Sequence, residues 1–264
     1  LSSWYKPALN NSCHWHQEDV EKFVIVESKY DHQGNKKNLK FKKENFKKFN
    51  SKINYKIIEN FPENYNDWER ENYQRNFIVN GLTEADDEDY IMISDVDEIP
   101  NIENLIKVKD RNFIAFKQRN FNLKINLLNK TYPDWYGTKL CKKKYLKSPQ
   151  WIRSQKVKPY SIFNFYRIKW NIIENGGWHF SFLMTPEDIV QKIKSFAHSE
   201  YNNEYFKDLK RINEAIKNNK DVFDRNQNYI KVNLDSSFPK FIINNVNKYN
   251  NWIIWINDFI FKVV

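Results

Sequence analysis

Glycine, proline and cysteine are scarce in this sequence, with 5, 8 and 2 occurrences among 264 residues. A sandwich of many short strands needs glycine in its tight turns, so the scarcity of glycine argues against that class. Two cysteines, Cys13 and Cys141, are too few to hold a metal cluster alone, and a disulfide between them stays open. No apolar stretch reaches 18 residues, so we expect no transmembrane helix.

Aromatic side chains and positive charge are abundant instead. Aromatic residues make up 17% of the chain and charged residues 29%, which is not a disordered composition. The length suits one large α/β domain or two small ones. The formal net charge of +10 favours polyanions, anionic membranes or phosphorylated ligands. The lysines occur in pairs and one run of three, so we expect most of them on solvated faces.

The stretch that organises the chain is residues 90–100, where a short apolar strand leads directly into three carboxylates. Successive side chains of a strand alternate between its faces, so Asp95 and Asp97 would point the same way if the strand continued to Pro100. Open α/β sheets bind ligands at the carboxyl ends of their strands. Paired carboxylates repel unless a divalent cation lies beside them. We therefore expect a metal-binding Asp-x-Asp edge, with an acidic turn as the alternative.

Hydrophobic patterns predict strands alternating with helices over the first 100 residues. Strands are expected at 23–27, 55–59 and 90–93. A helix capped by Asn66 and stopped at Gly81 separates the second strand from the third. This order predicts a right-handed parallel crossover.

The second half of the chain is expected to be mixed. Predicted elements are a helix at 102–108, a strand at 113–116, a mixed β region over 119–170, a strand at 176–182, and helices from Thr185, at 205–218 and at 241–255. Neither an internal repeat nor a linker is evident. We therefore expect one domain over 1–264, with an atypical segment at 1–22 and a helical C-terminal extension from about residue 200.

The N-terminal segment carries several weaker signals. Leu1 has neither an initiator methionine before it nor a signal-peptide pattern after it, and we interpret it as a trimmed or processed end. Cys13, His14 and His16 could hold a metal but lack a fourth partner nearby. Asn10 begins one of two N-glycosylation patterns; the other begins at residue 129, and both can arise by chance in an Asn-rich chain.

Several stretches together resemble glycosyltransferase family 17, the family of the bisecting β-1,4-N-acetylglucosaminyltransferase. The most specific are Asp-Val-Asp-Glu-Ile-Pro at 95–100 and Gly-Trp-His at 177–179. Further similar stretches are 23–28 with Gly34 and 39–41, 74–76 and 239–241, together with the separate positions Lys192, Ser195, His198 and Glu200. The matches follow the family order over roughly 23–250, whereas 1–22 departs from it.

This resemblance implies a GT-A fold, a Rossmann-like α/β/α sandwich with a mixed central sheet. It also implies inverting transfer of a sugar, typically from UDP-N-acetylglucosamine, to a glycan or other hydroxyl acceptor. A hard cation with carboxylate and phosphate ligands fits Mn²⁺ or Mg²⁺.

Specific roles follow from the resemblance and the residue types. Asp97 is expected to coordinate the metal, and Asp95 to bind the metal, a metal-bound water or the ribose. His179 is expected to be a further metal ligand or diphosphate contact, and Arg75 to hold phosphate or orient Asp95. The donor-binding candidates are Glu27, Arg75, Asp95, Trp178, His179 and His198.

Structural alternatives exist for these assignments. His179 could be packed beside Trp178 without a role in binding. Arg75 could form a surface ion pair with Glu71, four residues earlier on the same helix. Glu27 could simply terminate its strand.

Inversion needs a general base on the acceptor hydroxyl. The candidates are Glu187, Asp188 and Glu200, with His198 less favoured. Glu187 and Asp188 begin a helix, where a carboxylate is stabilised in any case. Glu200 follows the same helix and is the preferred candidate.

Functions from other classes remain open. The chain could be a glycan-binding or nucleotide-sugar-binding protein that has lost turnover, although a neutral glycan does not require paired carboxylates. A nucleic-acid-binding protein would need a continuous basic or stacking stripe, so no nucleic acid is expected. A metal-dependent nuclease or phosphatase would usually need ligands for a second metal, which the sequence does not indicate.

Overall fold

The computed structural model describes most of the chain, namely residues 20–103, 105, 110–158 and 168–255. The expectations about Cys13, His14, His16 and Asn10 lie outside these residues, as does most of the expected helix at 102–108.

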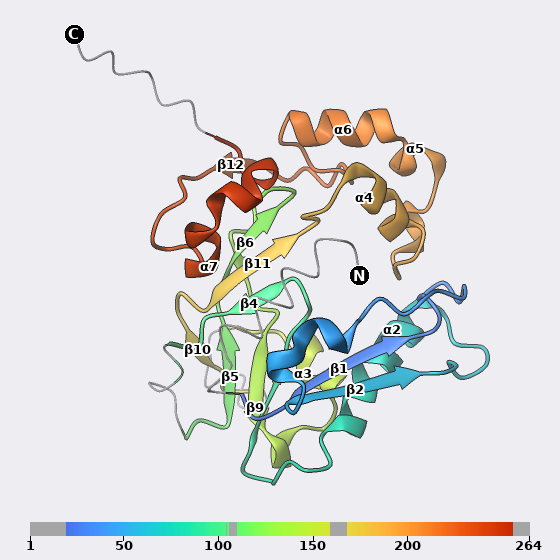
Figure 1. Ribbon diagram of the computed structural model, residues 1–264, viewed down its shortest axis with the longest axis vertical. Helices are drawn as coiled ribbons and strands as arrows, with labels where there is room; N and C mark the ends of the chain where they lie inside the picture. Colours follow the sequence, from blue (N-terminus) through green and yellow to red (C-terminus); the bar gives the residue numbers. More distant parts are fainter. Residues whose placement is uncertain (1–19, 104, 106–109, 159–167, 256–264) are drawn as a thin grey trace.

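Within the described residues, the strands form three hydrogen-bonded sheets (Figure 1). The first is a parallel pair, β1 (Phe23–Ser28) and β2 (Ile53–Ile58). The second has the order β10 (Asn171–Ile173), β5 (Phe113–Phe116), β9 (Lys139–Lys142) and β3 (Tyr90–Ile93). The third has the order β12 (Tyr229–Lys231), β7 (Leu127–Asn129), β6 (Gln118–Asn122), β11 (Gly177–Ser181) and β4 (Glu98–Pro100), with β8 (Asp134–Trp135) paired to β6.

Short helices connect and cover these sheets. The α-helices are α2 (Asp67–Asn76), α3 (Pro149–Ser154), α4 (Pro186–Ile193), α5 (Glu204–Lys207), α6 (Leu209–Lys217) and α7 (Lys240–Asn244). The 3₁₀ segments are η1 (Lys43–Phe49), η2 (Phe77–Gly81), η4 (Lys143–Tyr145), η6 (Ser199–Tyr201) and η7 (Val246–Trp252). Parallel and antiparallel pairs occur together, so the expected mixed α/β class is confirmed. Among these helices, none has the length and apolar character needed to span a bilayer.

The predicted start of α2 is confirmed, but the predicted crossover is wrong. Asn66 accepts a hydrogen bond from the Glu69 N–H and donates its own N–H to the Glu69 carboxylate, a complete capping box. The helix ends at Asn76, and η2 then turns the chain against β1 and β2. Gly81 permits this close packing, because a Cβ there would lie 2.4 Å from Cγ1 of Val24. The next strand, β3, is not paired with β2 and instead pairs antiparallel with β9 in another sheet.

The two C-terminal helices expected from periodicity are each divided. The segment expected as one helix at 205–218 is split at Asp208, whose side chain caps α6 by accepting the Arg211 N–H at 2.7 Å. The segment expected at 241–255 is α7 followed by η7. The helix expected to begin after Thr185 is confirmed as α4, and the Thr185 hydroxyl accepts the Asp188 N–H.

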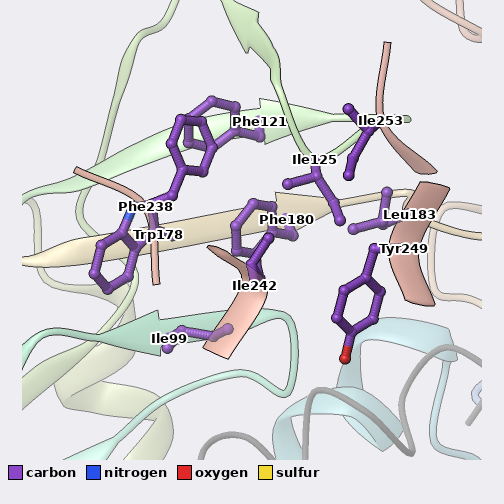
Figure 2. Close-up of a cluster of buried hydrophobic side chains, with 10 residues drawn as sticks. All are labelled: Ile99, Phe121, Ile125, Trp178, Phe180, Leu183, Phe238, Ile242, Tyr249 and Ile253. Carbon is purple, nitrogen blue, oxygen red and sulfur yellow. The ribbon is translucent and has the colours of Figure 1, made fainter. Parts of the chain in front are cut away.

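One face of the six-stranded sheet packs against the C-terminal segments. Ile99, Phe121, Trp178 and Phe180 from β4, β6 and β11 contact side chains of α7 and η7 (Figure 2). The neighbouring positions of the same strands point to the opposite face, because side chains alternate along a strand. That opposite face carries buried polar residues, namely Glu98, Gln118, Asn120, Asn122 and His179. The apolar face thus packs the sheet against the C-terminal segments, and the opposite face carries the buried polar side chains.

Candidate active site

The Asp-x-Asp stretch lies where the chain passes from one sheet to another. β3 of the four-stranded sheet ends at Ile93, and β4 of the six-stranded sheet begins at Glu98. The intervening turn is closed by the Glu98 N–H, which donates to the Asp95 carbonyl at 3.1 Å. The strand therefore does not continue, and the expectation that Asp95 and Asp97 share one strand face is wrong. Asp95 lies beside residues of α2 and α3, whereas Asp97 lies beside β11.

Asp95 is held by two guanidinium groups. Its Oδ2 lies 2.5 Å from Nη2 of Arg153 on α3, and its Oδ1 lies 3.5 Å from Nη2 of Arg75 on α2. Burial raises the pKa of Asp95, but the charges of Arg153 and Arg75 outweigh it and leave the pKa below its ordinary value. The charge of Asp95 is thus neutralised by the protein itself.

Glu98 is the buried centre of this turn. The exposed fraction of its side chain is 0%, and both carboxylate oxygens accept hydrogen bonds. Oε2 accepts the Asp95 N–H at 3.0 Å and the hydroxyls of Ser94 and Thr138 at 3.2 and 3.0 Å. Oε1 accepts Trp135 Nε1–H at 2.7 Å and Arg153 Nη2–H at 2.8 Å. A buried carboxylate with this many donors fixes the turn that carries both aspartates.

A glycine makes room for this arrangement. A Cβ on Gly137 would lie 1.7 Å from Oε1 of Glu98 and 2.2 Å from Nε1 of Trp135. Any larger residue at this position would displace one of the two hydrogen-bonded groups. Nearby, the ammonium group of Lys139 donates to the carbonyls of Arg153 and Gln155, both at 2.6 Å, and so secures the end of α3.

Asp97 faces a histidine whose tautomer is set by its neighbours. Nδ2 of Asn120 donates to the Tyr132 carbonyl at 2.9 Å, which orients Oδ1 of Asn120 towards His179. Nδ1 of His179 lies 2.9 Å from this Oδ1 and therefore carries the ring proton. Nε2 is left with a lone pair, 3.7 Å from Oδ1 of Asp97. The ring also stacks on Trp135, with centroids 4.3 Å apart and an interplanar angle of 10°.

Asp97 and His179 are suited to hold a cation between them. A separation of 3.7 Å is too long for a hydrogen bond, yet one ion with bonds of about 2.1 Å can contact both atoms. Within the described part of the chain, no three or more His, Cys, Asp and Glu side chains form a group that could hold a metal. The protein would thus supply two ligands, which suits a cation that is also bound by substrate phosphates.

Comparison with known families gives one match. The family model of glycosyltransferase family 17 matches residues 12–230. The chain belongs to glycosyltransferase family 17. The match includes part of the segment 1–22 that was expected to depart from the family, and it ends before the stretch at 239–241. No curated protein and no solved structure was found to match this glycosyltransferase.

Two other expected donor-binding residues of this glycosyltransferase, Glu27 and Trp178, form contacts that hold the fold together. Glu27, at the end of β1, accepts the N–H groups of Lys40 and Phe41 and the Tyr55 hydroxyl. Burial raises the pKa of Glu27, but these hydrogen bonds and the nearby charge of Lys37 bring the pKa below its ordinary value. Glu27 therefore organises the loop after β1.

Trp178 belongs to the apolar face of the sheet. Its ring lies in the core shown in Figure 2, and its Nε1–H donates to the Ser237 carbonyl at 3.0 Å. Its neighbour His179 points to the opposite face, so the two residues of the Gly-Trp-His stretch serve different surfaces. The structure thus gives Trp178 a packing role, and donor binding by Trp178 stays a prediction.

Arg75 combines both of its expected arrangements. Nη2 lies 3.0 Å from the Glu71 carboxylate as well as 3.5 Å from Asp95, and Nη1 donates to Gln150 at the start of α3. Arg75 therefore ties α2 to both the turn and α3.

The expected catalytic bases lie on α4 and just after it. Asp188 accepts a hydrogen bond from the Thr185 hydroxyl at 3.1 Å, and Glu187 lies beside it in the first turn of α4. Glu200 lies on η6, where its carboxylate is 2.8 Å from Nδ1 of His198. Among the described residues, none of these three carboxylates forms a hydrogen bond or ion pair with Asp97 or His179.

Several residues of this site were not expected from the sequence. They are Glu98, Asn120, Trp135, Lys139 and Arg153, contributed by β4, β6, β8, β9 and α3. One local signal existed for Arg153, because Ser148 followed by Pro149 is a typical helix start and would have predicted α3. Asn120, Trp135 and Lys139 lie in a stretch expected to be mixed β, where nothing local marks them. Glu98 is the third carboxylate of the stretch 90–100, and its buried position was not expected.

Proposed function

We propose that this glycosyltransferase transfers a sugar from a UDP donor to a hydroxyl of a glycan, with inversion and with Mn²⁺ or Mg²⁺. The resemblance of its motifs favours N-acetylglucosamine as the sugar and GT-A as the fold. The observation that carries the proposal is the pairing of the Asp97 carboxylate with the free lone pair of His179 Nε2. Both groups are ligands of hard or borderline divalent cations.

The chain's own residues hold this pair in place. Asn120 fixes the His179 tautomer, and Trp135 fixes the plane of the ring. Glu98 and Arg153 fix the turn from which Asp97 projects. When bound, the cation would neutralise the negative charge that develops on the leaving diphosphate.

The remaining need is a base for the acceptor hydroxyl. Glu187, Asp188 and Glu200 stay the candidates, because all three are carboxylates of α4 or of the turn that follows it. A base acts on the acceptor, so substituting it should lower the transfer rate and leave UDP affinity unchanged.

The metal requirement is tested by calorimetric titration of UDP with and without Mn²⁺. We expect binding that EDTA abolishes. Asp97→Asn should lower metal-dependent release of UDP from UDP-N-acetylglucosamine at least ~100-fold, since a catalytic metal contributes several kcal/mol. The matched control is Asp110→Asn, an exposed site with φ of 72°, which asparagine tolerates. Equal UDP affinity with and without metal would contradict the proposal.

A further inference from the structure

An exposed tryptophan lies on the face of α2 that leads to the candidate active site. Trp68 retains 46% of its accessible surface and does not belong to any hydrophobic core of the described residues. It precedes Arg75 by seven residues, which is two helical turns, so the two side chains lie on one face about 10 Å apart along the axis. Arg75 contacts Asp95 at one end of this face, and Trp68 marks the other end.

The side chains beside Trp68 are a histidine and a carboxylate held together. The rings of Trp68 and His198 meet at 84°, with centroids 4.6 Å apart. Nδ1 of His198 lies 2.8 Å from Oε1 of Glu200, and the exposed fractions of these two side chains are 48% and 58%. An aromatic ring, an imidazole and a carboxylate therefore meet at the surface, and each side chain is about half exposed.

The loop after β1 fixes this arrangement against α2. The His32 N–H donates to the Ser195 carbonyl at 3.2 Å, and the His32 carbonyl accepts from Arg70 of α2 at 3.0 Å. Gln33 joins the same loop to the turn that carries Glu200, because its Oε1 accepts from Asn202 at 3.0 Å. The segment bearing His198 and Glu200 is thus held in a fixed position beside the helix.

We propose that Trp68, His198 and Glu200 form a saccharide-binding subsite for the acceptor glycan. The indole offers a flat apolar surface for the C–H face of a sugar ring, and the carboxylate accepts hydrogen bonds from its hydroxyls. The proposal rests on the proposed glycosyl transfer, since it assigns the acceptor side of the same site.

This assignment gives Glu200 a binding role instead of the role of base. Partial burial raises the pKa of Glu200, but hydrogen bonds from His198 and its own backbone N–H lower it below the ordinary value. A general base works best with a pKa near the operating pH, so a lowered pKa suits a hydrogen-bond acceptor better. Glu187 and Asp188 then remain as the candidates for the base.

The test begins with the fluorescently labelled full chain on a printed glycan array, in the presence of UDP and Mn²⁺. The best-bound glycan is then titrated calorimetrically against Trp68→Ala, Trp68→Tyr and Glu200→Gln. We expect Trp68→Ala to weaken glycan binding at least ~10-fold, and Trp68→Tyr to restore most of it. Tyr145→Ala, which removes another exposed aromatic side chain, from η4, is the matched control and should bind the glycan like the wild type.

Kinetics with the bound glycan as acceptor separate the subsite from its alternatives. Glu200→Gln should raise the acceptor KM and retain kcat, whereas loss of kcat at unchanged KM would make Glu200 the base and overturn the subsite. Glycan affinity unchanged in Trp68→Ala would overturn it too, as would a wild-type chain that binds no glycan on the array. UDP binding is measured in parallel, so failure of the proposed donor chemistry is recognised separately.

Discussion

The sharpest prediction concerns Glu98, the buried carboxylate beneath the Asp-x-Asp turn. Glu98→Gln keeps the shape of the side chain but removes its charge and replaces one acceptor oxygen with a donor. Whichever oxygen becomes the NH₂ group meets N–H or O–H donors, since both oxygens of Glu98 accept hydrogen bonds. The substitution also leaves Arg153 with Asp95 as its remaining ion-pair partner among the described residues.

The expected cost follows from the burial of these groups. Removing one partner of a buried ion pair typically destabilises a protein by about 3–5 kcal/mol. For a chain of this size, each 1 kcal/mol lowers Tm by roughly 2–4 °C, so the expected loss is about 6–20 °C. The turn also carries Asp97, so metal-dependent UDP binding should weaken along with stability.

Urea unfolding followed by tryptophan fluorescence measures this cost, and calorimetry measures UDP binding at a temperature where the variant is folded. Glu174→Gln is the control, because its carboxylate pairs with Lys117 at the surface and is 68% exposed. A surface pair of this kind contributes about 0–1 kcal/mol. If Glu98→Gln unfolds at the wild-type urea concentration, Glu98 does not organise the turn and the reasoning fails.

Three further predictions test the groups around this turn. Asn120→Ala should weaken Mn²⁺-dependent UDP binding by about 10–100-fold, because the His179 tautomer is no longer fixed; a Mn²⁺ titration measures this. Gly137→Ala should lower the free energy of unfolding by about 1–3 kcal/mol, since its Cβ would meet Glu98; urea unfolding measures this. Burial, with the charge of Arg153, lowers the pKa of Lys139 to about 8. Between that pH and about 10.4, Lys139 is protonated in the unfolded chain but not in the folded protein, so the free energy of unfolding rises with pH. Lys139→Met should remove this rise, which urea midpoints measured across that range would show.

The sequence predicted the elements whose signals are local. The apolar runs of β1, β2, β3 and β5 and the Asn66 cap of α2 depend on neighbouring residues alone, and each is present as expected. The sequence also placed the carboxylates directly after β3, because that position depends only on neighbouring residues. Element boundaries were less accurate where a single residue divides a helix, as Asp208 does.

The contacts of the site were beyond sequence reasoning because they join distant segments. Arg153 meets Asp95 across 58 residues, and Asn120 meets His179 across 59. The strand β6 carries buried polar side chains at alternating positions, a pattern that ordinarily indicates a solvated face. Only the pairing of β6 with β11, which brings Asn120 opposite His179, shows that this polar face is buried around a site.

The two aspartates of one motif differ because the chain changes sheets between them. Asp95 and Glu98 lie against Arg75 and Arg153, so the negative charge at the base of the turn is balanced within the protein. Asp97 lies beyond the turn, and among the described residues its carboxylate has no arginine or lysine within ion-pair distance. The His179 ring lies beside this carboxylate, and its hydrogen bond to Asn120 leaves a lone pair facing Asp97. An anion and a lone pair that face each other are stabilised by a cation between them. The fold thus leaves an unbalanced negative charge at Asp97, where the proposed diphosphate-bound metal would supply positive charge.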